Sequence, residues 1–302
     1  CTQLLECTPQ VVTPNGFEPD FLPGKRIYAQ QRKAGRERLL RIASFLTGEK
    51  YTDDTFIIAT SGRNEYRNKG LDLYIDAVEA AGSACLRENG KILALILVPA
   101  WVKEPAGELL IDLNHGGADR PEVSYLTHRL NNEGEDSICR RLAQIQADSR
   151  QSNTRIIFVP CYLDGHDGIV DIAYYDLLPA LDMTVFASYY EPWGYTPLES
   201  VAFGVPTITT DKAGFGQWVL SNFKNSLCAT GAFVTPRNDS NYTESTNVIA
   251  SQIAEYMALP AAQIKSARQA AADTARKADW QFFIKDYEKA FDIALTNAAM
   301  RQ

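Results

Sequence analysis

Short apolar runs alternate with segments of helical periodicity over most of the chain. The predicted strands are residues 56–60, 93–98, 155–159, 184–187, 206–209 and 232–235. Several of them are apolar at consecutive positions, which is typical of strands that helices cover on both faces of a parallel sheet. The predicted helices between them are residues 71–81, 136–149, 173–181 and 197–203. The pattern predicts an α/β fold, a doubly wound Rossmann-like parallel sheet with helices on both faces.

Two stretches interrupt this alternation. Residues 103–136 carry glycines and prolines at scattered positions, which predicts an insertion with little regular structure. Residues 224–242 are rich in Gly, Pro, Asn and Asp and predict a surface loop. No internal repeat or low-complexity tract is present, so residues 1–302 are interpreted as one domain with an irregular insertion.

Helical patterns occur at both ends of the chain. Residues 280–291 form a helical stripe of Trp280, Ile284, Tyr287 and Phe291, and we expect this stripe to pack into the core. Residues 1–6 look like the middle of a helix, and we expect the chain to be a piece of a longer protein.

Composition narrows the function classes. The 302 residues include 30 basic and 37 acidic side chains, for a net charge of -7, and no basic face is concentrated enough to hold a nucleic acid. The longest apolar stretch, 92–102, is too short for a membrane span. Six scattered cysteines without a Cys-x-x-Cys pair indicate reduced thiols and a cytoplasmic location, and we expect no metal site. The three histidines are interpreted as structural.

The sharpest motif is residues 188–199, Ser-Tyr-Tyr-Glu-Pro-Trp-Gly-Tyr-Thr-Pro-Leu-Glu. It follows a predicted strand and leads into a helix near Thr196 or Pro197, where a proline suits the first position. Backbone amides of Gly194, Tyr195 and Thr196 then lie at a positive helix end that suits a phosphate. Glu191 and Glu199 flank this helix start and can bracket one ligand, although spacing alone also fits two solvated acids.

A second motif, residues 59–70, follows the first predicted strand. Arg63 offers a planar fork and Lys69 a point charge, a pair suited to a diphosphate. Because both motifs follow strand ends, we expect them to meet along one edge of the sheet. A third segment, Gly204–Thr210 followed by Gly-Phe-Gly at 214–216, is a weaker signal for close approach of backbone to a ligand.

Together these segments resemble the animal and fungal glycogen synthases, retaining glycosyltransferases of the GT-B fold. The run from Glu191 to Glu199 is similar to that family's two-glutamate motif, and Ser61-Gly62-Arg63 with Asn68-Lys69-Gly70 resembles its phosphate-binding loop. Residues 13–16 resemble the entry to the family's C-terminal domain, and Asp279-Trp280 the start of its closing helix. The resemblance spans nearly the whole chain and is weakest in the 103–136 insertion.

The resemblance implies a donor-binding GT-B C-terminal domain that transfers glucose from UDP-glucose or ADP-glucose to the non-reducing end of an α-1,4-glucan with retention. Arg63 and Lys69 are then expected to hold the donor phosphates, and Glu191 to lie by the reacting carbon. Glu199 is expected to accept hydrogen bonds from the ribose, and Tyr174 to stack on uracil. The amides at 194–196 complete the phosphate cradle. No cofactor or metal is implied, because the nucleotide sugar is itself a substrate.

The family's N-terminal domain, which supplies a catalytic histidine and most acceptor contacts, has no counterpart in this sequence. The α-glucan acceptor is therefore expected to bind through that missing domain, and an oligomer stays possible. No nucleic acid or membrane partner is expected. Two alternatives stay open: another retaining GT-B transferase, of the sucrose synthase or mannosyltransferase type, or a nucleotide-binding module without catalysis.

Overall fold

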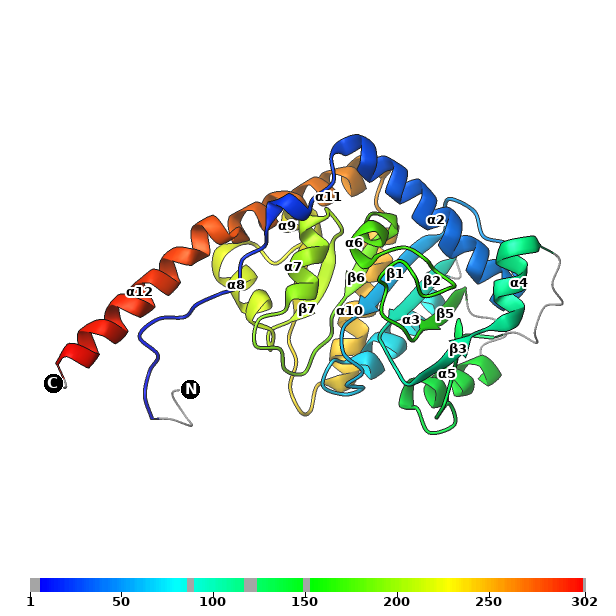
Figure 1. The fold of residues 1–302 in the computed structure, drawn as a ribbon, viewed down its shortest axis with the longest axis horizontal. Helices are drawn as coiled ribbons and strands as arrows, with labels where there is room; N and C mark the ends of the chain where they lie inside the picture. The colour runs from blue at the N-terminus through cyan, green and yellow to red at the C-terminus, as the bar shows by residue number, and fades with distance from the viewer. Residues whose placement is uncertain (1–5, 86–89, 117–123, 149–152, 301–302) are drawn as a thin grey trace.

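The computed structural model describes residues 6–85, 90–116, 124–148 and 153–300. Its centre is a six-stranded parallel sheet in the order β5-β2-β1-β6-β7-β8 (Figure 1). These strands are β1 (Phe56–Ser61), β2 (Ile92–Leu97), β5 (Thr154–Val159), β6 (Met183–Val185), β7 (Thr207–Thr210) and β8 (Ala232–Thr235). The order reverses between β1 and β6, the doubly wound arrangement that the strand pattern predicts. The predicted fold class is confirmed, and the apolar stretch that begins at residue 92 holds β2.

The sheet is buried on both faces because successive strand residues point to opposite sides. In β1, Ile57 and Ala59 join one apolar cluster, while Phe56 and Ile58 join the other. The first cluster includes residues of α2 (Lys25–Thr47), α4 (Gly107–His115), α6 (Tyr174–Leu177), α7 (Tyr195–Ala202), α8 (Gly214–Asn222) and α11 (Ala261–Ala275). The second includes residues of α3 (Leu71–Cys85), α5 (Ser137–Asp148), α9 (Leu227–Thr230) and α10 (Tyr242–Met257).

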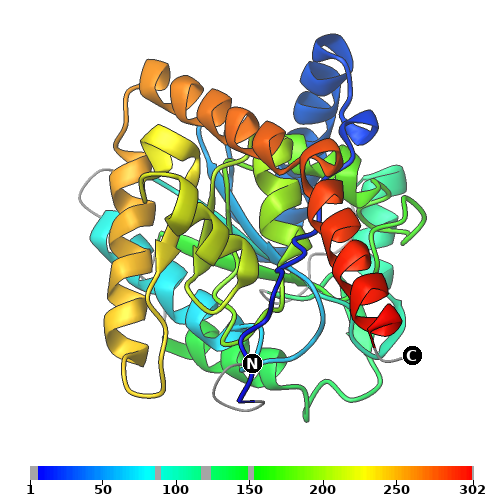
Figure 2. The same ribbon diagram turned by 90° about the vertical axis from the view of Figure 1, so that its left-hand side faces the viewer.

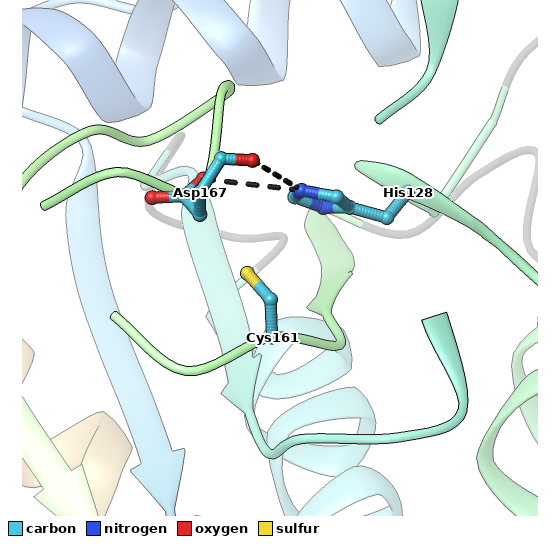
Figure 3. A group of neighbouring side chains, drawn as sticks. All are labelled: His128, Cys161 and Asp167. Carbon is cyan, nitrogen blue, oxygen red and sulfur yellow. Dashed lines mark hydrogen bonds and ion pairs between the residues drawn. The ribbon is translucent and has the colours of Figure 1, made fainter. Parts of the chain in front are cut away.

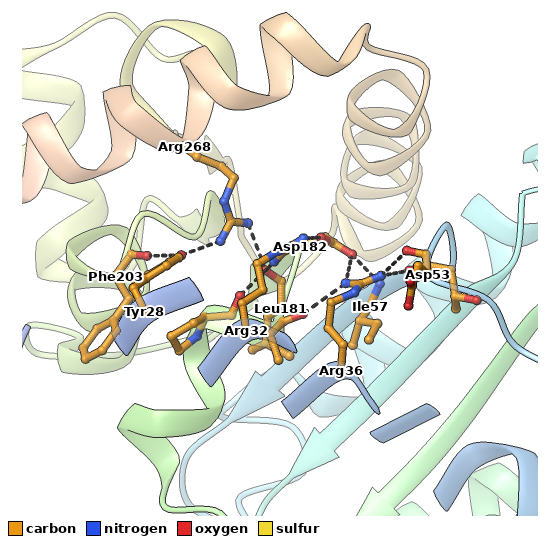
Figure 4. Close-up of polar contacts among 12 residues, drawn as sticks. Tyr28, Arg32, Arg36, Asp53, Ile57, Leu181, Asp182, Phe203 and Arg268 are labelled. Carbon is orange, nitrogen blue, oxygen red and sulfur yellow. Dashed lines mark hydrogen bonds and ion pairs between the residues drawn. The ribbon is translucent and has the colours of Figure 1, made fainter. Parts of the chain in front are cut away.

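A largely buried cluster of ion pairs holds α2 against the amino-terminal ends of β1 and β6 (Figure 4). Asp182, just before β6, accepts hydrogen bonds from Arg32 Nη2 at 2.7 Å, Arg36 Nη1 at 2.8 Å and the Ile57 amide at 2.9 Å. Arg36 also donates to the main-chain oxygen of Asp53 at 2.7 Å. Asp182 therefore links α2 to β1, and Arg36 extends the link to the turn before β1.

The 103–136 insertion is more ordered than its composition predicts. It carries the antiparallel pair β3 (Val102–Pro105) and β4 (His128–Leu130), with α4 between them. The expectation of little regular structure is wrong for its described part, because the glycines lie at element ends: Gly107 begins α4, and Gly116, with φ of 69°, follows it. Within residues 117–123 the prediction lies outside the described residues.

The predicted loop at 224–242 and two of the predicted helices also need correction. The first part of the predicted loop holds α9, whose N-cap Ser226 side chain accepts from the Ala229 amide. The strand predicted at residues 232–235 within it is confirmed as β8. The helix predicted from Pro197 begins two residues earlier, at Tyr195, so the proline is its third residue. A proline is tolerated there because the first helical amides have no intrahelical acceptor. The predicted helix 173–181 is α6 followed by a 3₁₀ turn, η3 (Leu178–Ala180).

The last helix, α12 (Trp280–Ala299), follows η4 (Arg276–Ala278) and extends beyond the body of the domain (Figures 1 and 2). The prediction that its stripe packs into the core holds only at its start, where Trp280 is half-buried against the first apolar cluster. Ile284 is 45% exposed and Phe291 62%, and the buried side chain is Phe283 instead. The helix runs past the sheet, so Ile284 and Phe291 stay exposed, while Trp280 and Tyr287 are half-buried. Residues 1–5, for which helical character was predicted, lie outside the described residues.

The N-terminal segment packs against the start of α12. The Phe17 amide donates to the Ala278 oxygen at 2.9 Å, and the Tyr287 hydroxyl donates to Asn15 Oδ1 at 3.0 Å. Gly16 lies so close that a Cβ there would be 2.5 Å from the Trp280 nitrogen. This contact joins the segments before α2 and after α11, and a 3₁₀ turn, η1 (Pro19–Phe21), leads from it toward α2.

Candidate functional site

A cavity of about 570 Å³ opens where the strand order reverses, at the carboxyl ends of β1 and β6. This is the position at which doubly wound sheets bind ligands, and the volume suits a nucleotide-sized molecule. Residues from both predicted motifs line it, together with residues after β2 and β5. The lining residues that the sequence predicted are Arg63, Lys69, Tyr174, Glu191, Tyr195, Thr196 and Glu199.

The loop after β1 reaches the cavity through two glycines with positive φ. Gly62 has φ of 132° and Gly70 of 64°, conformations that residues with a Cβ rarely adopt. A Cβ on Gly70 would also lie 1.9 Å from the Ala187 oxygen, so the chain passes β6 at backbone contact. The Tyr189 amide donates to the Asn68 oxygen at 2.7 Å. The two motifs are therefore hydrogen-bonded to each other through their main chains.

The loop after β6 is held from its other side by the segment before α8. The Glu191 amide donates to the Lys212 oxygen at 3.1 Å, and the Gly214 amide donates to the Glu191 oxygen at 3.1 Å. Trp193 is buried, in edge contact with Phe215 at 6.3 Å between ring centroids. These contacts fix the position from which the Glu191 side chain enters the cavity.

The start of α7 presents free backbone amides. Gly194 is its N-cap residue, with φ of 103°, and no side chain caps the helix. The first amides of a helix have no intrahelical acceptor, and the helix dipole places partial positive charge beside them. Tyr195 and Thr196 line the cavity, whereas Gly194 lies just outside its lining and acts through the turn that it allows.

The two cations of the site are placed differently. Lys69 Nζ contacts Glu191 Oε2, and their side chains are only 12% and 20% exposed. Arg63 contacts Glu65 at 3.1 Å, but its side chain is 73% exposed. Lys69 is thus held inside the cavity by the glutamate, while Arg63 stands at the rim with freedom to reorient. Both cations line the same cavity as Glu191, Tyr195 and Thr196.

The Glu199 side chain lines the cavity and is half-buried, so it is not a solvated residue on the surface of α7. Burial raises the pKa of its carboxyl above the ordinary value, and the Tyr175 hydroxyl, which donates to Oε1 at 2.8 Å, opposes that rise. Burial also raises the pKa of Tyr174, whose hydroxyl pairs with Ser61 Oγ at 2.9 Å. A half-buried carboxylate that is oriented by a hydrogen bond to one oxygen is well placed to accept hydrogen bonds from a ligand.

Sequence reasoning missed the wall formed by the loop after β5. Cys161, Tyr162, Leu163 and Asp164 line the cavity, and Tyr162 is 77% exposed. The signal was present, because this loop also follows a parallel strand. The partnership of Tyr175 with Glu199 was missed as well, since nothing in the spacing of the two residues predicts it.

One group of metal-type ligands lies among the described residues, made of His128, Cys161 and Asp167. The sequence analysis expects no metal site, because the members of this group are far apart along the chain. Cys161 lines the cavity, whereas His128 and Asp167 lie outside its lining. No helix in the described part of the chain is long and apolar enough to cross a bilayer.

A comparison with protein families matches residues 118–301 to the model described as glycogen synthase. Among curated proteins, the chain is 25% identical over 356 residues to a glycogen [starch] synthase of Neurospora crassa, covering 98% of this chain and 50% of that protein. It is 23% identical over 352 residues to the liver glycogen [starch] synthase of Homo sapiens, again covering 98% and 50%. The chain spans about half the length of these relatives.

Solved structures share the fold at low identity. The catalytic domain of starch synthase IV from Arabidopsis thaliana, bound to ADP and acarbose, aligns with a TM-score of 0.54 and 12% identity, covering 93% of this chain and 47% of that one. WaaG, a glycosyltransferase involved in lipopolysaccharide biosynthesis, aligns with a TM-score of 0.50 and 17% identity, covering 97% and 58%. Both are GT-B glycosyltransferases, which agrees with the topology.

Proposed function

The chain belongs to the glycogen synthase family, and on that premise we propose that it forms the donor-binding half of a retaining glucosyltransferase. The donor is UDP-glucose or ADP-glucose, and the acceptor is the non-reducing end of an α-1,4-glucan. Because the chain spans about half of its relatives, the acceptor contacts are assigned to a second domain outside it. Nothing in the site favours a sucrose synthase, a mannosyltransferase or a non-catalytic module.

The observation that carries this proposal is the convergence of two cations and a helix start on one cavity. Arg63 and Lys69 bind the diphosphate from the loop after β1, and the amides of Tyr195 and Thr196, presented by the turn at Gly194, bind it from the start of α7. Breaking the bond between sugar and phosphate places negative charge on the departing diphosphate. Donors fixed in advance stabilise that charge, and losing one typically costs about 3 kcal/mol in the barrier. The leaving group therefore needs no cofactor at this site.

The ion pair in the cavity suggests how the donor enters. Lys69 is held by Glu191 while the site is open, so it is already oriented. A diphosphate competes for the ammonium, and the exchange leaves the glutamate beside the sugar ring. There its negative charge stabilises the positive charge that grows on the ring as the bond breaks. Glu191 thus acts on the sugar and Lys69 on the leaving group.

The remaining predicted residues bind the nucleoside. Glu199 accepts hydrogen bonds from the ribose hydroxyls through the oxygen that Tyr175 leaves available. Tyr174 lines the same cavity and stacks on the base. The cytoplasmic location expected from the cysteines stays a prediction.

The test is glucosyl transfer by the intact longer protein, with UDP-glucose and ADP-glucose offered separately. Arg63→Ala lowers transfer at least about tenfold, because one preorganised donor is lost from the leaving group. The matched control is Arg67→Ala, since Arg67 is exposed on the same loop and lines a different hollow. Equal rates in the two variants would remove Arg63 from the site, and transfer of neither sugar by the wild type would refute the proposed reaction.

A further inference from the structure

Three side chains that the proposed reaction does not use meet beside the donor cavity (Figure 3). His128 comes from β4, and Cys161 and Asp167 come from the loop after β5. One ligand atom of each lies within 4.8 Å of the other two. The side chains of His128 and Asp167 are 2% and 1% exposed. The loop and the β3–β4 ribbon therefore bury a nitrogen, a sulfur and a carboxylate oxygen together.

The hydrogen bonds of His128 leave one ring nitrogen facing acceptors. Its Nδ1 lies 2.8 Å from Thr127 Oγ1, and that hydroxyl also lies 3.4 Å from the Phe158 oxygen. Its Nε2 lies 3.0 Å from the main-chain oxygen of Asp167 and 3.9 Å from Oδ1 of the same residue. In the tautomer that carries the hydrogen on Nδ1, the lone pair of Nε2 faces these oxygens and can bind a cation between them.

Asp167 is held as a carboxylate by the turn that follows it. Its Oδ1 accepts from the amides of Ile169 at 3.0 Å and Val170 at 2.7 Å, and its Oδ2 from that of Asp171 at 2.8 Å. These three neutral donors orient the carboxylate without neutralising it. In metal sites, hydrogen bonds to a ligating carboxylate and to the second nitrogen of a ligating histidine hold these ligands in the orientation that the ion needs.

We propose that His128 Nε2, Cys161 Sγ and the Asp167 carboxylate bind a divalent transition-metal ion of the zinc class. A mixed set of imidazole, thiolate and carboxylate is the set zinc prefers over magnesium or calcium. Zinc lies about 2.0–2.3 Å from such ligands, so the three atoms close by small side-chain rotations. The ion displaces the thiol proton to solvent, and the main-chain oxygen of Asp167 or a water fills the fourth position.

The ion would add a side-chain link between two segments whose neighbours already meet at β5, where the Phe158 amide donates to the Tyr125 oxygen and the Thr127 amide donates to the Phe158 oxygen. His128 belongs to the β3–β4 ribbon, while Cys161 begins the loop whose next residues, Tyr162 to Asp164, line the donor cavity. Binding therefore fixes one wall of the cavity against the insertion. This site is structural and lies apart from the residues proposed to hold the diphosphate.

The experiment measures metal binding by the 302-residue chain itself. The chain is equilibrated with zinc chloride, desalted and analysed for bound zinc, and a second sample is loaded with cobalt for absorption spectroscopy. We expect one metal ion per chain and a thiolate-to-cobalt charge-transfer band. Thermal unfolding of the wild type must shift upward with free zinc, since a ligand that binds only the folded state stabilises it by RT ln(1 + [L]/Kd).

Variants assign the ligands. Cys161→Ser loses the charge-transfer band. Thr127→Val, which changes only a neighbour of His128, weakens zinc binding by roughly 10–100-fold. His128→Gln, which removes a ligand, weakens it further. Cys228→Ser is the matched control, because Cys228 is exposed and outside the group. A wild-type chain that retains no zinc and shows no thermal shift would overturn the proposal. So would a band that survives Cys161→Ser, or nitrogen NMR showing His128 doubly protonated with zinc present.

Discussion

The ion cluster around Asp182 allows a quantitative test of what holds α2 against the sheet. Asp182→Asn keeps the shape of the side chain and removes its charge. Asp182 is 16% exposed and its partner Arg36 only 10%, so the guanidinium is left buried without its counter-ion. The amide also cannot accept all three hydrogen bonds that the carboxylate accepts from Arg32, Arg36 and the Ile57 amide.

Removing one partner of a buried pair typically costs about 3–5 kcal/mol, and the partial exposure of Asp182 places the expectation near the lower end, about 3 kcal/mol. Burial by itself raises the pKa of Asp182, but Arg36 and Arg32 outweigh it and hold the pKa below the ordinary value. A depressed carboxyl pKa contributes stability above the unfolded pKa and loses it as the pH falls through the folded one. The difference between wild type and variant is therefore complete at neutral pH and shrinks in acid.

The assay is urea unfolding of the 302-residue chain at neutral pH and in acid. The matched control is Asp53→Asn, because Asp53 is exposed and only its main-chain oxygen meets Arg36. We expect the control to stay within about 0.5 kcal/mol of wild type. If Asp182→Asn costs no more than the control, or if its cost grows in acid, the account of the cluster is wrong.

Three further predictions concern the cavity. Gly70→Ala destabilises the chain by at least about 1 kcal/mol in urea unfolding, because a Cβ meets the Ala187 oxygen at 1.9 Å, whereas Gly24→Ala, with open space around it, stays near wild type. Glu191→Gln tightens UDP binding in calorimetry, since it frees the neighbouring ammonium; weaker binding would contradict the exchange of partners. Glu199→Gln weakens UDP binding, and the ratio of wild-type to variant affinity falls as the pH drops through the raised pKa of Glu199; a ratio independent of pH would exclude the ribose contact.

The sequence predicts most of the sheet because burial leaves a direct trace in it. All six predicted strands are present, since a strand covered on both faces must be apolar at nearly every position. The cavity follows from the same reasoning: Arg63 and Glu191 each come shortly after a strand, and parallel strands end at one edge. Local pattern and global topology agree at these residues.

Features that depend on distant contacts could not be predicted. The stripe of α12 has the periodicity of a core helix, but whether Phe291 is buried depends on what lies opposite it. In the 103–136 insertion, Gly107 and Gly116 mark the ends of a short helix, and their composition alone does not distinguish that from an irregular loop. The meeting of His128 with Cys161 depends on how the ribbon folds over the sheet.

The most direct test of the central claim is calorimetric titration of the 302-residue chain with UDP and with uridine, without added metal. If two loops and a helix start hold a diphosphate, UDP binds far more tightly than uridine. Lys69→Met then lowers the affinity for UDP at least about tenfold, the loss of one charge-assisted contact, and leaves that for uridine unchanged. Equal affinities for UDP and uridine in the wild type, or a Lys69→Met variant that binds UDP as the wild type does, would contradict the account.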